Sequence, residues 1–147
     1  MSDSLSIQRW IQFAQRDFDA AYNMSVLHQP IPLDIVCYLC QQSVEKILKA
    51  YTLAQSEPLA KTHDLKSILK QCMRYDNEFA TFVDACAILT GYAIASRYPL
   101  DEDWIEQHDM EVALKSAQEI LKFTKKRLSE LGYVDAESEK AESSSKE

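Results

Sequence analysis

A short motif in the second half of this 147-residue chain, Arg97-Tyr98-Pro99, combines side chains that could bind phosphate. The guanidinium of Arg97 is a rigid fork of hydrogen-bond donors that suits phosphate oxygens, and the phenol of Tyr98 follows directly. The proline disfavours helical angles in the residue before it, so a helix should end here. Arg97 could equally satisfy the last carbonyls of that helix, and the motif leaves both roles open.

An acid and a set of polar residues form a second candidate, on two expected helices. Asp17 falls on the apolar side of the first helix, where it either reaches water at the edge of the stripe or meets a cation. A polar strip at helical spacing on the next helix contains Gln42, Glu45, Lys46 and Lys49. The strip is either a solvated face, or one of its lysines partners Asp17 or an anion.

Metal and cofactor chemistry lack a complete motif. Cys37 and Cys40 resemble half of a zinc site, but no second ligand pair at comparable spacing follows, so we expect both thiols in the core. The acids of residues 101–109, with His108, match no calcium loop and are explained as a helix-capping connector. No glycine-rich phosphate loop or serine nucleophile motif occurs. We therefore expect no metal and no cofactor.

Composition limits the possible partners. The formal net charge is -7, which argues against a general attraction to nucleic acid or anionic lipid, although a local basic patch is still allowed. No apolar run reaches the length of about 20 residues that a membrane span needs. The first residues also lack the basic and apolar blocks of a signal peptide, so we expect a cytoplasmic location and reduced cysteines.

Apolar periodicity predicts helices that would position these candidates. With 2 glycines and 4 prolines, the chain has few turn residues. Helices are expected at 5–27, from a cap at Asp34 to about residue 55, a short one at 65–72 capped by Asp64 or Thr62, from Asp76-Asn77 through residue 93 to a stop at Pro99, and 110–131 with Gly132 as its C-cap. The predicted fold is all-α: one up-down bundle of four long helices and one short helix over residues 1–132. Residues 133–147 are expected to be a disordered acidic tail.

A series of residues, taken in order and spacing, is similar to one known family. The series comprises Trp10, Ala14, Asp17 and Ala21, then residues 38–50 with the pattern QQxxEKxLKA, Thr62-His63-Asp64-Leu65, Tyr92 with Arg97-Tyr98-Pro99, and Ala113, Ala117 and Ile120. It resembles the HEPN family, a small helical domain named for nucleotide binding in higher eukaryotes and prokaryotes. The resemblance covers residues 7 to about 131 and implies a homodimeric bundle of four or five helices.

The resemblance also implies partners and a possible reaction. Many family members are encoded beside a minimal nucleotidyltransferase and act with it as a toxin and antitoxin. Catalytic members are metal-independent endoribonucleases with an arginine, four to six residues, and then a histidine. Counting from Arg97, that histidine position falls on Glu102, Asp103 or Trp104, and the first histidine is His108, after ten residues. Cleavage needs both groups at one phosphate, so this spacing disfavours it.

The sequence thus predicts a noncatalytic HEPN-type homodimer that binds a nucleotide or a nucleotidyltransferase-type protein partner. The resemblance implies ligand-binding roles for Arg97, Tyr98, His63, Lys46 and Asp17. Two alternatives remain. One is an endoribonuclease toxin that cleaves RNA with Arg97 and a displaced His108. The other is a purely structural dimerisation module.

Overall fold

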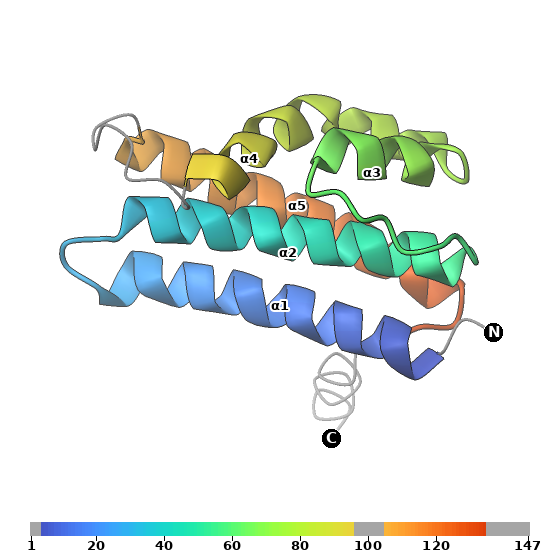
Figure 1. Cartoon of the computed structure of the whole chain (residues 1–147). Helices are drawn as coiled ribbons and strands as arrows, with labels where there is room; N and C mark the ends of the chain where they lie inside the picture. The colour runs from blue at the N-terminus through green and yellow to red at the C-terminus, as the bar shows by residue number, and fades with distance from the viewer. Residues whose placement is uncertain (1–3, 96–104, 135–147) are drawn as a thin grey trace, which may run out of the picture.

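The computed structural model describes residues 4–95 and 105–134, and every regular element within those ranges is a helix. The elements are α1 (Ser4–Leu27), α2 (Leu33–Ala54), α3 (Leu65–Met73), the 3-10 helix η1 (Asn77–Phe82), α4 (Val83–Ala95) and α5 (Gln107–Glu130). The long helices α1, α2 and α5 run side by side, and α3 and α4 pack across α2 from the other side (Figure 1). The predicted all-α bundle is confirmed.

Local capping chemistry sets the ends of α3 and α5. The Asp64 side chain accepts a hydrogen bond of 3.1 Å from the backbone N–H of Lys66, as the sequence predicts for the start of α3. After α5, Gly132 adopts a positive φ of 96°, which glycine tolerates without a Cβ clash. Its N–H donates to the carbonyl of Ser129 at 3.0 Å, so the predicted glycine does end the helix, although Leu131 is the C-cap and Gly132 is the residue after it.

Three helix starts differ from the prediction. Asp34 lies inside the first turn of α2, because Pro32 occupies the position before the helix and no side chain caps it. α5 starts at Gln107 rather than Met110, since Glu106 and Asp109 form a reciprocal capping box. The fourth helical segment is 3-10 over Asn77–Phe82 before it continues as α4.

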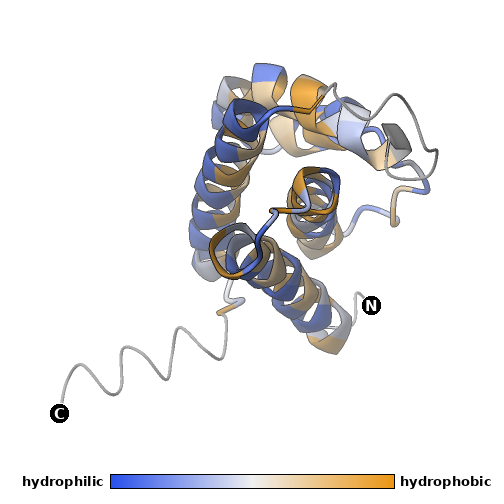
Figure 2. Cartoon of the chain, turned by 90° about the vertical axis from the view of Figure 1, so that its left-hand side faces the viewer, coloured by the Kyte–Doolittle hydropathy of each residue, from blue (hydrophilic) through white to orange (hydrophobic). Residues whose placement is uncertain are grey.

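α2 is the central helix of the bundle. Thirteen of its 22 residues are buried, and it contacts α1, α3, α4 and α5. A view along the bundle shows α2 surrounded by the other helices, with their hydrophilic residues mainly outward (Figure 2). α1 lies close to α2 at Ser43, which has a small side chain. The buried Ser43 Oγ donates a hydrogen bond of 2.7 Å to the Ala14 carbonyl of α1. Polar residues on α2 are therefore held in fixed positions by neighbours on several sides.

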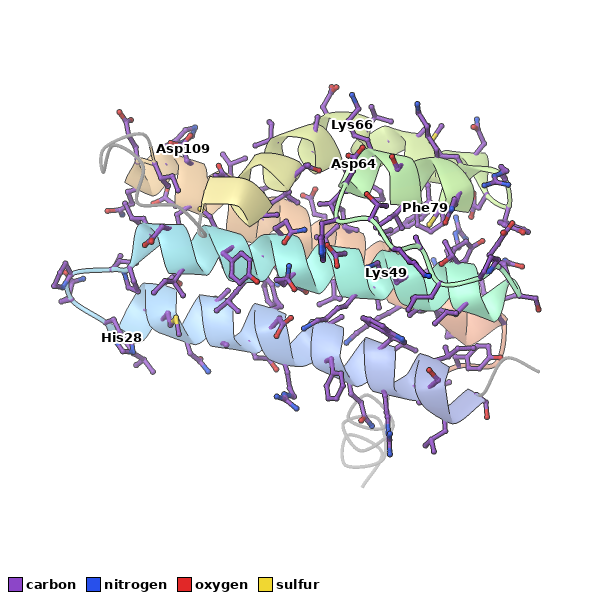
Figure 3. All side chains as sticks on the ribbon, viewed as in Figure 1. His28, Lys49, Asp64, Lys66, Phe79 and Asp109 are labelled. Atoms are coloured by element: carbon purple, nitrogen blue, oxygen red, sulfur yellow. The ribbon has the colours of Figure 1, made fainter. Side chains whose placement is uncertain are left out.

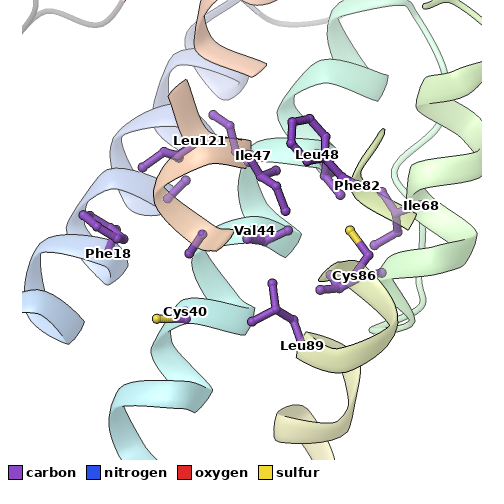
Figure 4. Packing of buried hydrophobic residues seen from close by; sticks show 14 of the residues in the cluster. Phe18, Cys40, Val44, Ile47, Leu48, Ile68, Phe82, Cys86, Leu89 and Leu121 are labelled. Carbon is purple, nitrogen blue, oxygen red and sulfur yellow. The ribbon is translucent and has the colours of Figure 1, made fainter. Parts of the chain in front are cut away.

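The apolar core forms where α2 meets the other helices. Val44, Ile47 and Leu48 of α2 are fully buried, and they pack with Phe18 of α1 and Leu89 of α4 (Figure 4). Burying one such aliphatic side chain stabilises the fold by about 1.5–3 kcal/mol. This core anchors the helices that carry the candidate site.

The four cysteines belong to the core. Cys37, Cys40, Cys72 and Cys86 are all free thiols with no exposed surface, which confirms the packing role predicted for the first two. Desolvation by burial raises the pKa of the Cys37 and Cys86 thiols to about 12, and it raises the pKa of the other two as well. Within the described ranges, no group of three or more His, Cys, Asp or Glu residues could hold a metal ion.

Thiol reactivity checks this burial. We expect the folded protein at pH 8 to react very slowly with a disulfide reagent such as dithionitrobenzoate, and the unfolded protein to release all 4 thiols at once. The folded state keeps its thiol protons above pH ~8.5, where the unfolded chain loses them, so stability should fall as the pH rises past this value. A Ser129→Cys variant, at an exposed site, provides the reactive control. Fast reaction of a native cysteine would contradict the burial.

Two further expectations concern membranes and the end of the chain. No helix within the described ranges is long and apolar enough to span a bilayer. Of the tail predicted over residues 133–147, only Tyr133 and Val134 lie in the described part, and Tyr133 packs against the core. The predicted disorder of residues 135–147 falls outside the described residues.

Candidate functional site

An ion pair joins α1 to α2 near the middle of both helices. Lys46 Nζ lies 2.5 Å from Asp17 Oδ2, and the two side chains are 25% and 19% exposed. The sequence left open whether Asp17 reaches water or meets a cation, and in the structure it meets Lys46. The contact neutralises the acid on the apolar side of α1 and fixes the lysine along the helix pair.

A second ion pair, between two residues of α2 on either side of Lys46, is buried. Glu45 and Lys49 are only 4% and 6% exposed, and Lys49 Nζ donates to Glu45 Oε2 at 3.0 Å. Gln41 Nε2 donates to the other carboxylate oxygen at 3.0 Å. Gln41, Glu45 and Lys49 are each four residues apart, so they form one line on α2. The buried carboxylate is thus held by two donors from its own helix.

The segment between α2 and α3 adds a histidine to this line. His63 Nδ1 lies 3.0 Å and 3.1 Å from the two Glu45 carboxylate oxygens. Local bonds set the segment's course, because Thr62 Oγ1 accepts from the Asp64 N–H at 3.0 Å and Asp64 then caps α3. In Figures 1 and 3 this segment, which ends at Asp64, passes along the side of α2 that carries Lys49. The fold therefore brings residues 45 and 63 together.

The contact with Glu45 determines what the imidazole of His63 can do. A carboxylate accepts hydrogen bonds, so Nδ1 carries the donated hydrogen and Nε2 is left for another partner. The side chain of His63 is 55% exposed, and Nε2 has no partner within the described ranges. A buried carboxylate that orients an accessible imidazole is a common arrangement in binding and catalytic sites.

The interpretation of the polar strip on α2 as a solvated face is wrong for two of its four members. Glu45 and Lys49 are buried, with His63 of the segment before α3 against Glu45 and the ring of Trp10 of α1 near Lys49, and Gln42 and Lys46 are partly buried. The alternative, that one lysine of the strip partners Asp17, is correct for Lys46. The cluster contains two acids and two lysines, so its formal charge is balanced when His63 is neutral.

Two participants were not identified as site residues from the sequence. Gln41 is fully buried and links Gln42 to Glu45, since its Oε1 accepts from Gln42 Nε2 at 2.7 Å. Trp10 lies with its ring centroid 6.0 Å from Lys49 Nζ, which places a π face near the buried ammonium. The four-residue spacing of Gln41, Glu45 and Lys49 is the one signal that could have revealed the line.

The structure describes only part of the predicted site. Asp17 and Lys46 are in contact, and His63 contacts Glu45, which precedes Lys46 on α2. Arg97 and Tyr98 lie outside the described residues. His108 is exposed in the first turn of α5, and its neighbour Asp109 lies at the end of the bundle away from Lys49 and Asp64 (Figure 3).

Comparisons with known proteins agree with this fold. The sequence model of the HEPN domain matches residues 7–128. The structure of TT1696 from Thermus thermophilus is similar with a TM-score of 0.67 and 22% identity, covering 82% of this chain and 96% of that one. ST0689, described as an archaeal HEPN homologue, has a TM-score of 0.64 and 23% identity, with the same two coverages. No curated protein matches the chain.

Proposed function

Because this chain belongs to the HEPN family, we propose that it is a noncatalytic homodimeric module that binds a nucleotide at the site containing Asp17, Lys46 and His63. Arg97 and Tyr98 are proposed to complete this site, with the guanidinium of Arg97 contacting phosphate. The alternative ligand is a nucleotidyltransferase-type protein, with which the chain would form a toxin and antitoxin pair.

The observation that carries this proposal is the accessible imidazole of His63 held on a buried charge pair. Burying Glu45 and Lys49 removes two charges from water, and apolar residues in their place would often be as stable or more stable. Stability alone therefore gives little reason for the pair. Its evident effect is to orient the exposed imidazole of His63, whose partner Glu45 directly precedes Lys46 on α2.

The noncatalytic part of the proposal follows from spacing. Ten residues separate Arg97 from His108, and His108 lies on the exposed first turn of α5. An imidazole that acts as a general base must reach the hydroxyl whose proton it removes, and small displacements lower the rate strongly. We accordingly expect phosphate binding without strand cleavage.

Calorimetric titration of the full chain with adenine and guanine nucleotides tests the proposal. We expect saturable binding, and a loss of about 10-fold or more in affinity for Arg97→Ala, because a charge-assisted hydrogen bond contributes about 1.5–3 kcal/mol. Arg74→Ala is the matched control. Arg74 is an exposed arginine whose guanidinium lies 3.7 Å from Glu57, so this variant should bind like the wild type.

Three results would contradict parts of the proposal. Absence of binding by every nucleotide would remove the nucleotide as ligand, and co-purification with a nucleotidyltransferase would then test the alternative ligand. Equal binding by Arg97→Ala would remove the role of that guanidinium. Sedimentation as a monomer would exclude the homodimer, and cleavage of RNA by metal-free protein that disappears in His108→Ala would establish the endoribonuclease instead.

A further inference from the structure

Both lysines of the site are already paired with carboxylates. Lys46 Nζ lies 2.5 Å from Asp17 Oδ2, and Lys49 Nζ donates to Glu45 at 3.0 Å from a buried position. A phosphate placed at Lys46 would have to displace Asp17 or lie beside its negative charge. Like charges in a partly buried site repel strongly, because water screens them less than in bulk. This part of the site is therefore poorly suited to an anion.

His63 offers a different kind of contact. In the tautomer that donates its Nδ1 hydrogen to Glu45, Nε2 is a hydrogen-bond acceptor. An acceptor pairs with a donor, such as a sugar hydroxyl or a base amino group, and not with the oxygens of a phosphate. The 55% exposed ring leaves this atom accessible, while the buried pair beneath it keeps the ring in place.

We infer that the His63 imidazole, held by Glu45, accepts a hydrogen bond from the nucleoside part of the ligand, and that phosphate is bound elsewhere in the site. This inference rests on the nucleotide-binding function proposed above. It divides the ligand between two groups of residues. His63 contacts sugar or base beside the paired charges of Asp17, Lys46, Glu45 and Lys49, and the phosphate is bound by other residues.

The test compares the four ribonucleosides, their 5′-monophosphates and inorganic phosphate as ligands of the full chain. His63→Asn is the main variant, because the asparagine amide can still donate to Glu45 from the position of Nδ1 but has no group at the position of Nε2. We expect this variant to weaken a bound nucleoside and its monophosphate by the same factor of about 3–10, the value of one hydrogen bond.

A second variant tests the charge balance. Asp17→Asn removes the carboxylate partner of Lys46, so the ammonium becomes available to an anion. We expect this variant to bind inorganic phosphate and the monophosphates more tightly than the wild type, with nucleoside affinity changed much less. The thermal midpoint of each variant, measured alongside, shows whether the fold is retained.

Where a nucleoside binds, the matched 2′-deoxynucleoside and a nucleoside without the base amino group identify the donor. Loss of the His63 effect with the deoxy form assigns the sugar hydroxyl, and loss with the other form assigns the base.

The outcomes separate this inference from the function on which it rests. If no nucleoside or nucleotide binds, the proposed function fails, and the inference fails with it. If nucleotides bind but His63→Asn binds them like the wild type, His63 only fastens the segment to α2, and the inference alone is wrong. It is also wrong if the variant weakens monophosphates but not nucleosides, or if Asp17→Asn leaves phosphate affinity unchanged.

Discussion

Lys49→Met should lower the free energy of unfolding by about 3–5 kcal/mol. The substitution leaves the Glu45 carboxylate buried at 4% exposure with donors but without its positive partner. An uncompensated buried charge is among the most destabilising changes in a protein interior, whereas the methionine itself fits the apolar surroundings. Urea unfolding followed by circular dichroism measures the loss.

Two variants serve as controls for this prediction. Lys46→Met removes a lysine of the same helix whose pair with Asp17 is partly exposed, and we expect a loss of about 1 kcal/mol or less. The double variant Glu45→Gln with Lys49→Met removes both buried charges and should recover most of the stability. If Lys49→Met cost no more than Lys46→Met, the buried pair would not exist in solution.

Phe79→Ala should lower the free energy of unfolding by a similar amount, about 3–5 kcal/mol. Phe79 has no exposed surface, and its ring centroid lies 4.8 Å from that of Tyr51 and 5.0 Å from that of Phe123. Its removal leaves a cavity where η1 meets α2 and α5, and it deletes two aromatic contacts. The same urea titration measures this loss.

Phe13→Ala is the matched control for the aromatic prediction. Phe13 is 40% exposed on α1, and its described ring contact is with the Arg16 guanidinium, 5.0 Å from the ring centroid. We expect this variant to lose less than about 1 kcal/mol, since exposed side chains rarely contribute more. Similar losses for the two phenylalanine variants would contradict the packing of η1 against the core.

The sequence was sufficient to predict the helices because apolar periodicity and capping residues, which mark a helix, are local features of the chain. Apolar periodicity located α1, α2 and α5 to within a few residues, and Asp64 and Gly132 marked helix ends through bonds to nearby backbone. The start of α5 was missed by three residues because a capping box with Glu106 outside the helix was not considered. Such errors are small, since neighbouring residues along the chain decide them.

The candidate site was only half visible in the sequence. Asp17 and Lys46 could be suggested as partners, because each is a polar residue at helical spacing on an expected helix. The contact of His63 with Glu45 could not, since they are 18 positions apart and the segment between α2 and α3 has no periodicity to constrain its path.

What the sequence determined by itself is an all-α chain with the order of residues typical of the HEPN family, since periodicity, caps and spacing are properties of neighbouring residues. What only the tertiary structure decided is which polar residues are buried. On the sequence, Glu45, Lys46 and Lys49 form one polar strip, yet in the structure Glu45 and Lys49 are buried, with His63 against the Glu45 carboxylate, while Lys46 pairs with Asp17 of α1. Burial depends on what packs against a helix face, and residues distant in the sequence supply that cover.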